Sequence, residues 1–433
     1  MKVTIRSEEF KSEETLVVSF DVSKDKLNYF FCYRDATDGQ RRECEEHFSN
    51  RTPVIERQLR EFRALGQQQG LPELLVVCEP TGGYERSLLK TAHRLGLRTA
   101  YVNPESVNKL QVVQSNDSGK TDEKDPRTIH TLAAVGKTLK QRPLPEPYLQ
   151  LRRLHGFYED EVDAGVRLRG HLQAVLQELF CDYAQSADFL YTKTGKALLD
   201  RYGFNPYRIV ADSWGQFVRN LQRHSRVRLT VLEAIYQAAK ASRLHQASAW
   251  EQEVLEQRLR QLYQDWERHE QRKAELRQQM TEIFSRLPEH QTLGGIPKVS
   301  AFHLARLVAQ TGPLSDFRHS AQLVRLSGLN LRERRSGKYV GQLKISKKGR
   351  ALLRKVLYQV CFGCLIGKGR LYHEYYQAHV NPKQSHSAMR TMVSVMRKFV
   401  KLLHGVHRSR TAFNPARVRV SASEFARQQK LAV

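Results

Sequence analysis

Hydrophobic and polar residues follow strand-like and helix-like patterns in the first third of the chain. Residues 15–34, "TLVVSFDVSKDKLNYFFCYR", hold two apolar runs around the polar turn Ser23–Asp25, which predicts two strands. The segments that follow predict a helix over 53–70, a strand, a Thr-Gly-Gly turn, a helix and a strand over 71–103, and helices over 104–114 and 127–139. This order of strands and helices predicts an α/β domain within residues 1–140.

The pattern becomes helical in the middle of the chain. Three prolines in 141–150 indicate a linker, and long amphipathic helices are predicted over 149–180 and 229–287, the second broken once. The two helices could pair as an antiparallel coiled coil, with a small helical insertion at about 182–228. We therefore expect a linker and coiled-coil domain over 141–287 and a mainly α-helical, basic domain over 288–433.

The positive charge of the chain is concentrated near its C-terminal end. The formal net charge is +26, and residues 281–433 alone contain 28 Lys and Arg but only 6 Asp and Glu. Such asymmetry indicates a polyanionic partner, and nucleic acid is the most plausible. A basic surface that only aids solubility is the alternative explanation.

Other features of the composition point to the cytoplasm. The chain has no apolar run long enough to span a bilayer and no apolar signal segment in "MKVTIRSEEFKSEE", so we expect no membrane partner. Its six cysteines are scattered, which favours reduced thiols.

Four carboxylates are candidate site residues. Asp21 ends the apolar run "VVSFD" and Glu79 ends "LLVVCE"; carboxylates at the C-terminal ends of buried strands emerge at the sheet edge where α/β proteins bind ligands. Asp122 and Asp125 precede the next predicted helix. Asp125 also fits an N-cap with Pro126 at the first helical position, and the pair also fits a solvated charge cluster.

Acids that converge on a sheet edge repel one another unless a cation lies between them. Carboxylate oxygens suit Mg²⁺ or Mn²⁺. Two such ions stabilise the attacking and leaving oxygens in phosphodiester chemistry, which agrees with a chain built to attract phosphate.

The acidic segments resemble a known family. "SFDVSKDKL", "VVCEPTGGY", "VNPESVNKL" and "KTDEKDPRTIHTLA" are similar to the successive motifs of the DEDD transposases of bacterial insertion sequences, also called bridge-RNA-guided recombinases. The resemblance implies a RuvC-type, RNase H-like N-terminal fold. It also places the family's four metal-binding acids on Asp21, Glu79, Asp122 and Asp125.

A serine among bases is the second candidate. Ser336 lies beside Gly337 in "RERRSGKYVGQLKISKKGR", where it could attack a phosphodiester while the bases offset the developing charge. A Ser-Gly turn in a DNA-binding loop is the alternative. The candidate nucleic-acid-binding bases are Arg332, Arg334, Arg335, Lys338, Lys344, Lys347, Lys348, Arg350 and Arg354.

This basic segment resembles the second conserved domain of the same transposases. The matching pairs are Gly328–Leu329, Ser336–Gly337, Lys348–Gly349 and Leu353–Arg354. The resemblance places the family's nucleophilic serine on Ser336, with Ser327 and Ser346 as neighbouring alternatives.

Membership of this family would imply a complete mechanism. The serine would form a covalent 5′-phosphoserine with DNA, and an acidic site with Mg²⁺ would complete a catalytic centre shared between subunits of a homodimer or homotetramer. A structured bridge RNA would pair with donor and target DNA at the bacterial nucleoid. The rival functions are a RuvC-like metal-dependent junction endonuclease and a non-catalytic nucleic-acid-binding protein.

Overall fold

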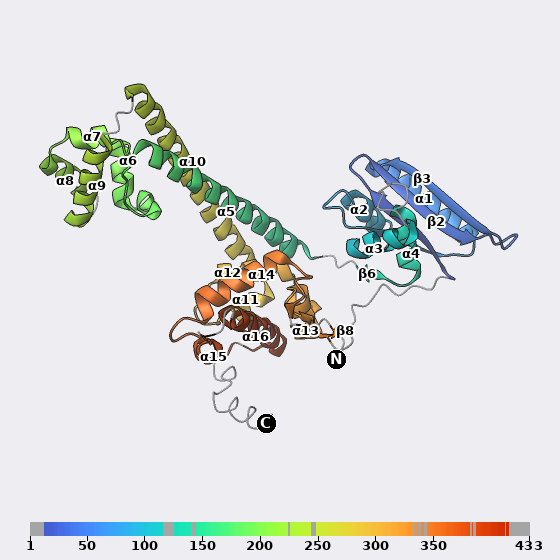
Figure 1. The fold of residues 1–433 in the computed structure, drawn as a ribbon. Helices are drawn as coiled ribbons and strands as arrows, with labels where there is room; N and C mark the ends of the chain where they lie inside the picture. Colours follow the sequence, from blue (N-terminus) through green and yellow to red (C-terminus); the bar gives the residue numbers. More distant parts are fainter. Residues whose placement is uncertain are drawn as a thin grey trace. The chain divides into compact units, whose positions relative to one another are not determined.

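The computed structural model describes most of the chain. The described residues are 13–115, 125–140, 144–223, 226–243, 248–332, 335–336, 339–341, 344–381, 383, 387–411 and 413–414. They belong to two compact units, Met1–Pro143 and Leu144–Val433, which we call the sheet unit and the helical unit (Figure 1). None of the helices in the described ranges has the length and apolar character required to cross a membrane.

The sheet unit contains one mixed six-stranded sheet with helices on both faces. Its elements are β1 (Thr15–Val22), β2 (Lys26–Arg34), β3 (Arg41–Ser49), α1 (Thr52–Gln68), β4 (Glu73–Cys78), α2 (Arg86–Arg94), β5 (Arg98–Val102), α3 (Pro104–Ser115), α4 (Asp125–Ala134) and β6 (Thr138–Lys140). The strand order is β3-β2-β1-β4-β5-β6. Strands β1, β4 and β5 are mutually parallel, and the other neighbouring pairs are antiparallel.

Alternation along the central strands creates two separate cores. Leu16, Val18 and Phe20 of β1 point to the face that α1 and α2 cover. Val17 points to the opposite face, where Val107 of α3 and Ile129 of α4 join the core. Since side chains alternate along a strand, Ser19 and Asp21 belong to this second face, which we call the α4 face.

Two strands of this sheet were missed in the sequence. The sequence of β3, "RRECEEHFS", is mostly charged and largely exposed, and an edge strand that buries little has no apolar pattern. Strand β6 has only three residues, and it ends the helix predicted over 127–139 at Ala134.

The helical unit is built around two long helices. Its elements are α5 (Glu146–Leu179), η1 (Ala187–Tyr191), α6 (Lys193–Tyr202), α7 (Pro206–Ala211), α8 (Trp214–Gln222), α9 (Leu229–Ser242), α10 (Ala249–Ser285), α11 (Pro288–Leu293), α12 (Ala301–Thr311), η3 (Leu314–Asp316), α13 (Ser320–Leu326), β7 (Leu331–Arg332), β8 (Arg335–Ser336), β9 (Tyr339–Val340), β10 (Lys344–Ile345), α14 (Ala351–Val360), η4 (Cys361–Leu365), α15 (His373–His379) and α16 (Ser387–Ser409). The helical pattern predicted over 229–287 is thus divided between α9 and α10.

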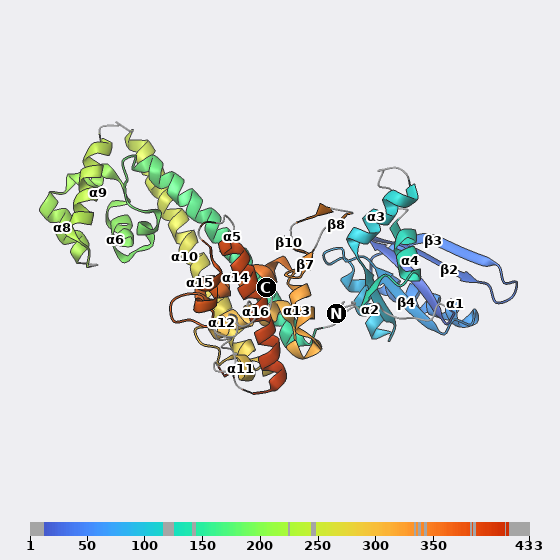
Figure 2. The same ribbon diagram turned by 60° about the horizontal axis from the view of Figure 1, so that its bottom comes forward.

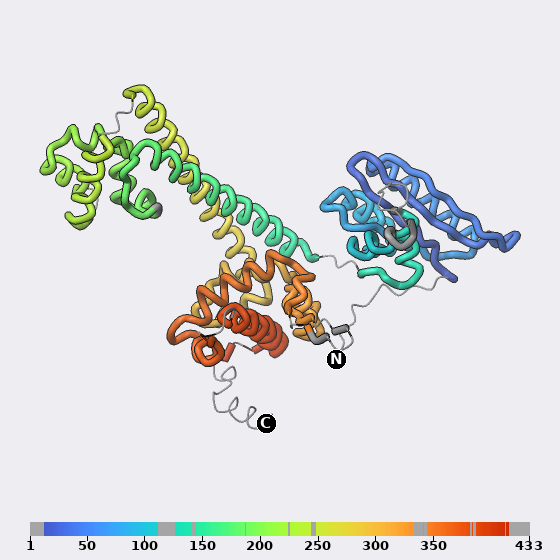
Figure 3. The backbone as a smooth tube through the Cα atoms, in the orientation of Figure 1, coloured from blue at the N-terminus to red at the C-terminus, as the bar shows by residue number. Residues whose placement is uncertain are grey.

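Helices α5 and α10 run antiparallel and join two cores (Figure 3). Leu151 near the start of α5 and Phe284 near the end of α10 belong to the core of the C-terminal helices. Leu176 near the end of α5 and Leu259 of α10 belong to the core of the small helices between them. We call these the proximal and distal cores.

Candidate functional site

Asp21 and Glu79 leave adjacent parallel strands at the same end of the sheet. Phe20 of β1 pairs with Cys78 of β4, so the two acids follow paired residues. Leu75 and Val77 belong to the α4 face, and alternation places the position of Glu79 there as well. The sequence prediction that these two acids emerge together is therefore supported by the register of the strands. Both residues are half-buried.

The start of α4 lies over the same strand. The Ser19 hydroxyl is 2.8 Å from the carbonyl oxygens of Phe30 and Pro126, and its one proton links β1 to either carbonyl. Asp125 is the first residue of α4, so its backbone lies close to the strand that carries Asp21. Only the backbone of Asp125 is described, and Asp122 lies outside the described residues.

The donor chemistry at this end of the sheet suits a hard cation. Asp21 and Glu79 offer carboxylate oxygens, which Mg²⁺ and Mn²⁺ prefer. Burial, followed by the charges of Glu85 and Glu79, raises the pKa of the Cys78 thiol, so this sulfur stays protonated. Among the described side chains no group of three or more His, Cys, Asp or Glu is placed to hold a metal ion.

A further acid shapes the turn after Glu79, and the sequence reasoning missed it. Glu85 is buried, and its carboxylate accepts hydrogen bonds from the Thr81 hydroxyl and the Gly83 amide, both at 2.9 Å. Gly82 and Gly83 have φ values of +78° and +143°, which side-chain-bearing residues rarely adopt. The signal for this role was the motif "TGGYE", in which an acid follows a glycine pair.

Ser336 lies on a short antiparallel extension of the helical unit. Strand β7 pairs with β10, and Ser336 of β8 pairs with Tyr339 of β9 (Figure 2). We call residues 331–345 the serine hairpin. The sequence predicted a loop here, whereas the backbone forms two short ladders. The side chain of Ser336 lies outside the described part of the structure.

Close backbone packing holds the base of the serine hairpin. A Cβ atom on Gly349 would lie 2.5 Å from the Gly328 nitrogen and from the Leu326 oxygen. The Lys347 amide donates to the Gly328 oxygen at 3.0 Å, and the Arg350 amide donates to the Leu326 oxygen at 2.7 Å. Gly328 and Gly349 are therefore needed for their two chain segments to pack backbone against backbone.

The two alternative serines have structural partners. Ser327 is fully buried, and its hydroxyl donates to the Val324 carbonyl at 2.8 Å. The Ser346 hydroxyl donates to Asn330 Oδ1 at 2.7 Å and accepts from the Lys348 amide at 3.2 Å. Their geometry favours a role in shaping the hairpin base over a role as nucleophile.

The predicted basic residues divide into two groups. Arg332, Lys344, Lys347 and Lys348 are exposed, and Arg350 is half-buried. Arg354 differs because its guanidinium donates to the Ser327 carbonyl at 3.1 Å, which braces the hairpin base from α14. The side chains of Arg334, Arg335 and Lys338 lie outside the described residues.

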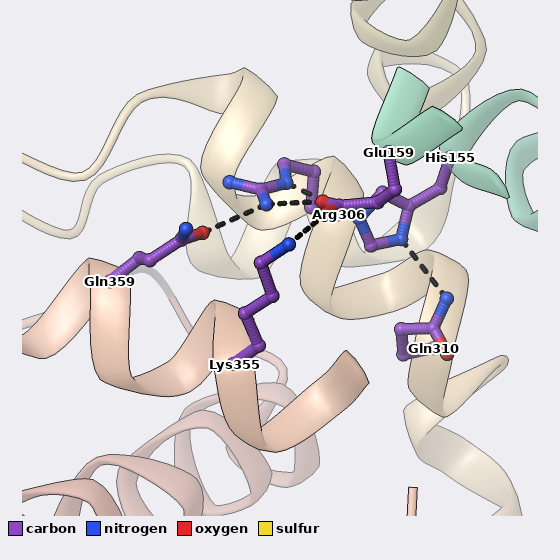
Figure 4. A network of polar contacts seen from close by, with 6 residues as sticks. All are labelled: His155, Glu159, Arg306, Gln310, Lys355 and Gln359. Atoms are coloured by element: carbon purple, nitrogen blue, oxygen red, sulfur yellow. Dashed lines mark hydrogen bonds and ion pairs between the residues drawn. The ribbon is translucent and has the colours of Figure 1, made fainter. Parts of the chain in front are cut away.

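A buried ionic network supports α14 from behind (Figure 4). Glu159 of α5 accepts from Arg306 of α12 at 2.5 Å and from Lys355 of α14 at 2.7 Å. Arg306 also donates to Gln359 of α14 at 2.8 Å. Despite its burial, which acts in the opposite direction, hydrogen bonds from His155, Lys355 and Arg306 lower the pKa of Glu159.

His155 completes this network as a neutral ring. Burial lowers its pKa, so it carries one proton at neutral pH. Its Nδ1 is 3.0 Å from Gln310 Nε2, and its Nε2 is 3.1 Å from Glu159. Arg306 Nε donates to the same His155 Nε2 at 3.2 Å. The network ties α5, α12 and α14 together.

Two family comparisons match this arrangement. Residues 18–181 match a DEDD-type family described as Transposase, and residues 290–377 match the Transposase IS116/IS110/IS902 family. The first match contains Asp21 and Glu79, the second contains the serine hairpin, and together they span more than half of the chain. No curated protein matches the chain significantly.

Both comparisons define the same class of protein, a DNA transposase. The two matches support a transposase of the IS110 type. Its substrate is therefore DNA, and its DEDD domain indicates a general dependence on divalent metal ions.

Proposed function

We propose that the protein is an RNA-guided transposase that cuts and rejoins DNA through Ser336. The observation that carries the proposal is the side-by-side exit of Asp21 and Glu79 from β1 and β4, on the face where α4 begins. The sheet order β3-β2-β1-β4-β5 supports a RuvC-type, RNase H-like fold for the sheet unit.

The acidic residues would bind the metal. Asp21, Glu79, Asp122 and Asp125 would hold Mg²⁺ or Mn²⁺, and a bound ion would stabilise negative charge on the phosphate oxygens. Support comes from the hard oxygen donors at the strand ends, and from the position of Cys78, whose side chain is buried in the core on the opposite face of the sheet.

Ser336 would perform the strand exchange. Its Oγ attacks the phosphorus, one of the four carboxylates takes the hydroxyl proton, and the bond from phosphorus to the 3′-oxygen breaks. The products are a 5′-phosphoserine and a 3′-hydroxyl, and the reverse attack by another strand's 3′-hydroxyl rejoins the DNA. The exposed Arg332, Lys344, Lys347 and Lys348 would hold the backbone phosphates.

A covalent trapping experiment tests the nucleophile. A DNA substrate is incubated with the protein, guide RNA and Mg²⁺, and denaturing gels detect a protein–DNA adduct. Ser336→Ala should abolish the adduct, while Ser409→Ala, a serine on exposed helix surface, should leave it intact. Asp21→Asn should lower the rate of cleavage about a hundredfold or more.

Two outcomes would assign a different function. Hydrolysis that survives Ser336→Ala would identify a metal-dependent junction endonuclease in which the acids activate water. Binding without strand cleavage in Mg²⁺, across varied guide RNAs, would identify a non-catalytic nucleic-acid-binding protein. DNA strand exchange that proceeds equally well without RNA would show that the reaction needs no guide RNA.

We also propose that each catalytic centre is shared between subunits of a dimer or tetramer. Large apolar side chains on the paired helices support a subunit contact there, because Phe157, Val166 and Val254 are all more than half exposed. Mixing Ser336→Ala and Asp21→Asn proteins tests the sharing. A shared site would regain activity in mixed oligomers, whereas a site within one subunit would stay inactive.

A further inference from the structure

Two aromatic side chains lie stacked and exposed on α14 and η4. The rings of Tyr358 and Phe362 are 5.9 Å apart, with an angle of 8° between their planes. Phe362 is 60% exposed and Tyr358 is 37% exposed. Leaving two aromatic rings in water sacrifices the stabilisation that their burial would bring, so this pair requires an explanation outside the proximal core.

The helix geometry presents this pair away from the core. Segment η4 continues α14 as a π-helical turn, a feature that is frequent at functional sites. Cys361, Cys364 and Leu365 of this segment are buried in the proximal core, whereas Phe362 faces outward.

The aromatic pair continues a line of residues from the serine hairpin. Arg354, Tyr358 and Phe362 follow one another at four-residue intervals, which places them along one side of the helix. Arg354 contacts the hairpin base through the Ser327 carbonyl. From Arg354 to Phe362 the helix rises about 12 Å, the length of three to four stacked bases.

The charges around the pair favour a nucleic acid over a protein. Arg370 donates a hydrogen bond to the carbonyl of Gly363, next to Phe362, and Lys368 is exposed nearby in the chain. A second copy of this chain would bring the same excess of positive charge to the contact, whereas DNA brings phosphates.

We propose that Tyr358 and Phe362 form a stacking platform for unpaired bases of the DNA strand cut at the serine hairpin. Any base can stack on an aromatic ring, so the platform tolerates changes of sequence. It would hold the strand open beside the nucleophile during exchange. The platform's place in the reaction rests on the proposed function, whereas its binding of single-stranded DNA can be tested separately.

The test measures binding without chemistry. Full-length protein in EDTA is titrated into fluorescent oligodeoxythymidine and into duplex DNA. Phe362→Ala should weaken single-strand binding about tenfold, leave duplex binding unchanged, and leave the salt dependence unchanged because no phosphate contact is lost. Phe362→Trp should retain the affinity. Because EDTA removes the metal and no bond is cut, this result does not depend on the assignment of Ser336.

Leu229→Ala is the control, since Leu229 of α9 is 54% exposed and lies outside both the aromatic pair and the proposed subunit contact. The proposal is overturned if Phe362→Ala binds oligodeoxythymidine as tightly as the unchanged protein. It is equally overturned if that variant changes the oligomeric state in sedimentation, which would make a second copy the occupant. If Phe362→Ala loses affinity only for oligouridine RNA, the platform binds RNA, and the proposal for DNA is rejected.

Discussion

The two candidate regions are held in place in different ways. Asp21 lies near the end of β1 and Glu79 follows β4, and each of these strands is paired with a strand on both sides. Ser336 lies in a two-residue strand whose one ladder partner among the described strands is β9. The position of the acids is therefore fixed by a whole sheet, whereas the position of the serine depends on a few contacts at the hairpin base.

This difference leads to a general expectation about local opening. Elements with few backbone bonds open at a lower free energy than the core of a sheet. Substitutions at the hairpin base should therefore affect exchange of hydrogens in the serine hairpin and leave the sheet unit unchanged.

The largest effect is expected from Glu159→Gln. The change leaves buried Arg306 without its anion, and loss of one partner in a buried ion pair costs about 3–5 kcal/mol, while Lys355 is closer to solvent. Urea unfolding of the helical unit measures the loss in the free energy of unfolding, and hydrogen exchange at α12 and α14 locates it. Glu161→Gln on the same helix is the control, since its partners His269 and Arg272 are closer to solvent. Equal losses in the two variants would contradict a special role for the network.

Gly349→Ala should destabilise the base of the serine hairpin by about 3 kcal/mol, because the new Cβ meets backbone atoms that cannot move aside. Faster hydrogen exchange at the amides of Ser346, Lys347 and Arg350 would report the opening, with β1 and β4 unchanged. Gly405→Ala in α16 is the control, because nothing lies within 4 Å of its Cβ position. Unchanged hydrogen exchange in Gly349→Ala would show that the Gly328 and Gly349 segments can move apart without opening the hairpin base.

Acidification should weaken the sheet unit through His130. Burial, followed by the charge of Arg41, lowers its pKa to about 4 from an ordinary value of 6.5. The folded state binds this proton less readily, so its stability is complete above pH 6.5 and declines as the pH falls towards 4. We expect a loss of at most about 2 kcal/mol between pH 7 and pH 5. Hydrogen exchange in α4 measures it, and His130→Gln should flatten the pH dependence.

The smallest effect is expected from Ser346→Ala. It removes the hydroxyl's hydrogen bonds to Asn330 and from the Lys348 amide at the partly exposed hairpin base, and such a bond contributes about 1 kcal/mol. Thermal unfolding of the helical unit should show a small decrease in Tm. Cleavage that survives Ser346→Ala would agree with a structural role, whereas complete loss of the covalent adduct would make Ser346 the nucleophile.

The sequence was sufficient for features that depend on local pattern. Apolar runs located β1 and β4, and the acids at their ends followed from the run lengths. Charged β3 carried no such pattern, because its pairing with β2 stabilises a strand that its own side chains do not indicate.

Long-range contacts could not be derived in the same way. Glu159 meets partners 147 and 196 residues away in the chain, and no spacing rule connects them. The role of Gly349 could not be predicted either, because a glycine in a basic segment indicates only a turn when the neighbouring backbone is unknown. The residue types of the hairpin base could be read from the sequence, but the contact of Gly349 with Gly328 could not.

The paired helices α5 and α10 also bear on how such a protein can change in evolution. The chain enters the distal helices at the end of α5 and leaves them at the start of α10, so both connections lie on one pair of neighbouring helices. Adding or removing equal numbers of turns in both helices would lengthen or shorten the helix pair without altering the proximal core. The distal bundle is thus an interchangeable module, free to acquire new binding surfaces at no expense to the catalytic parts.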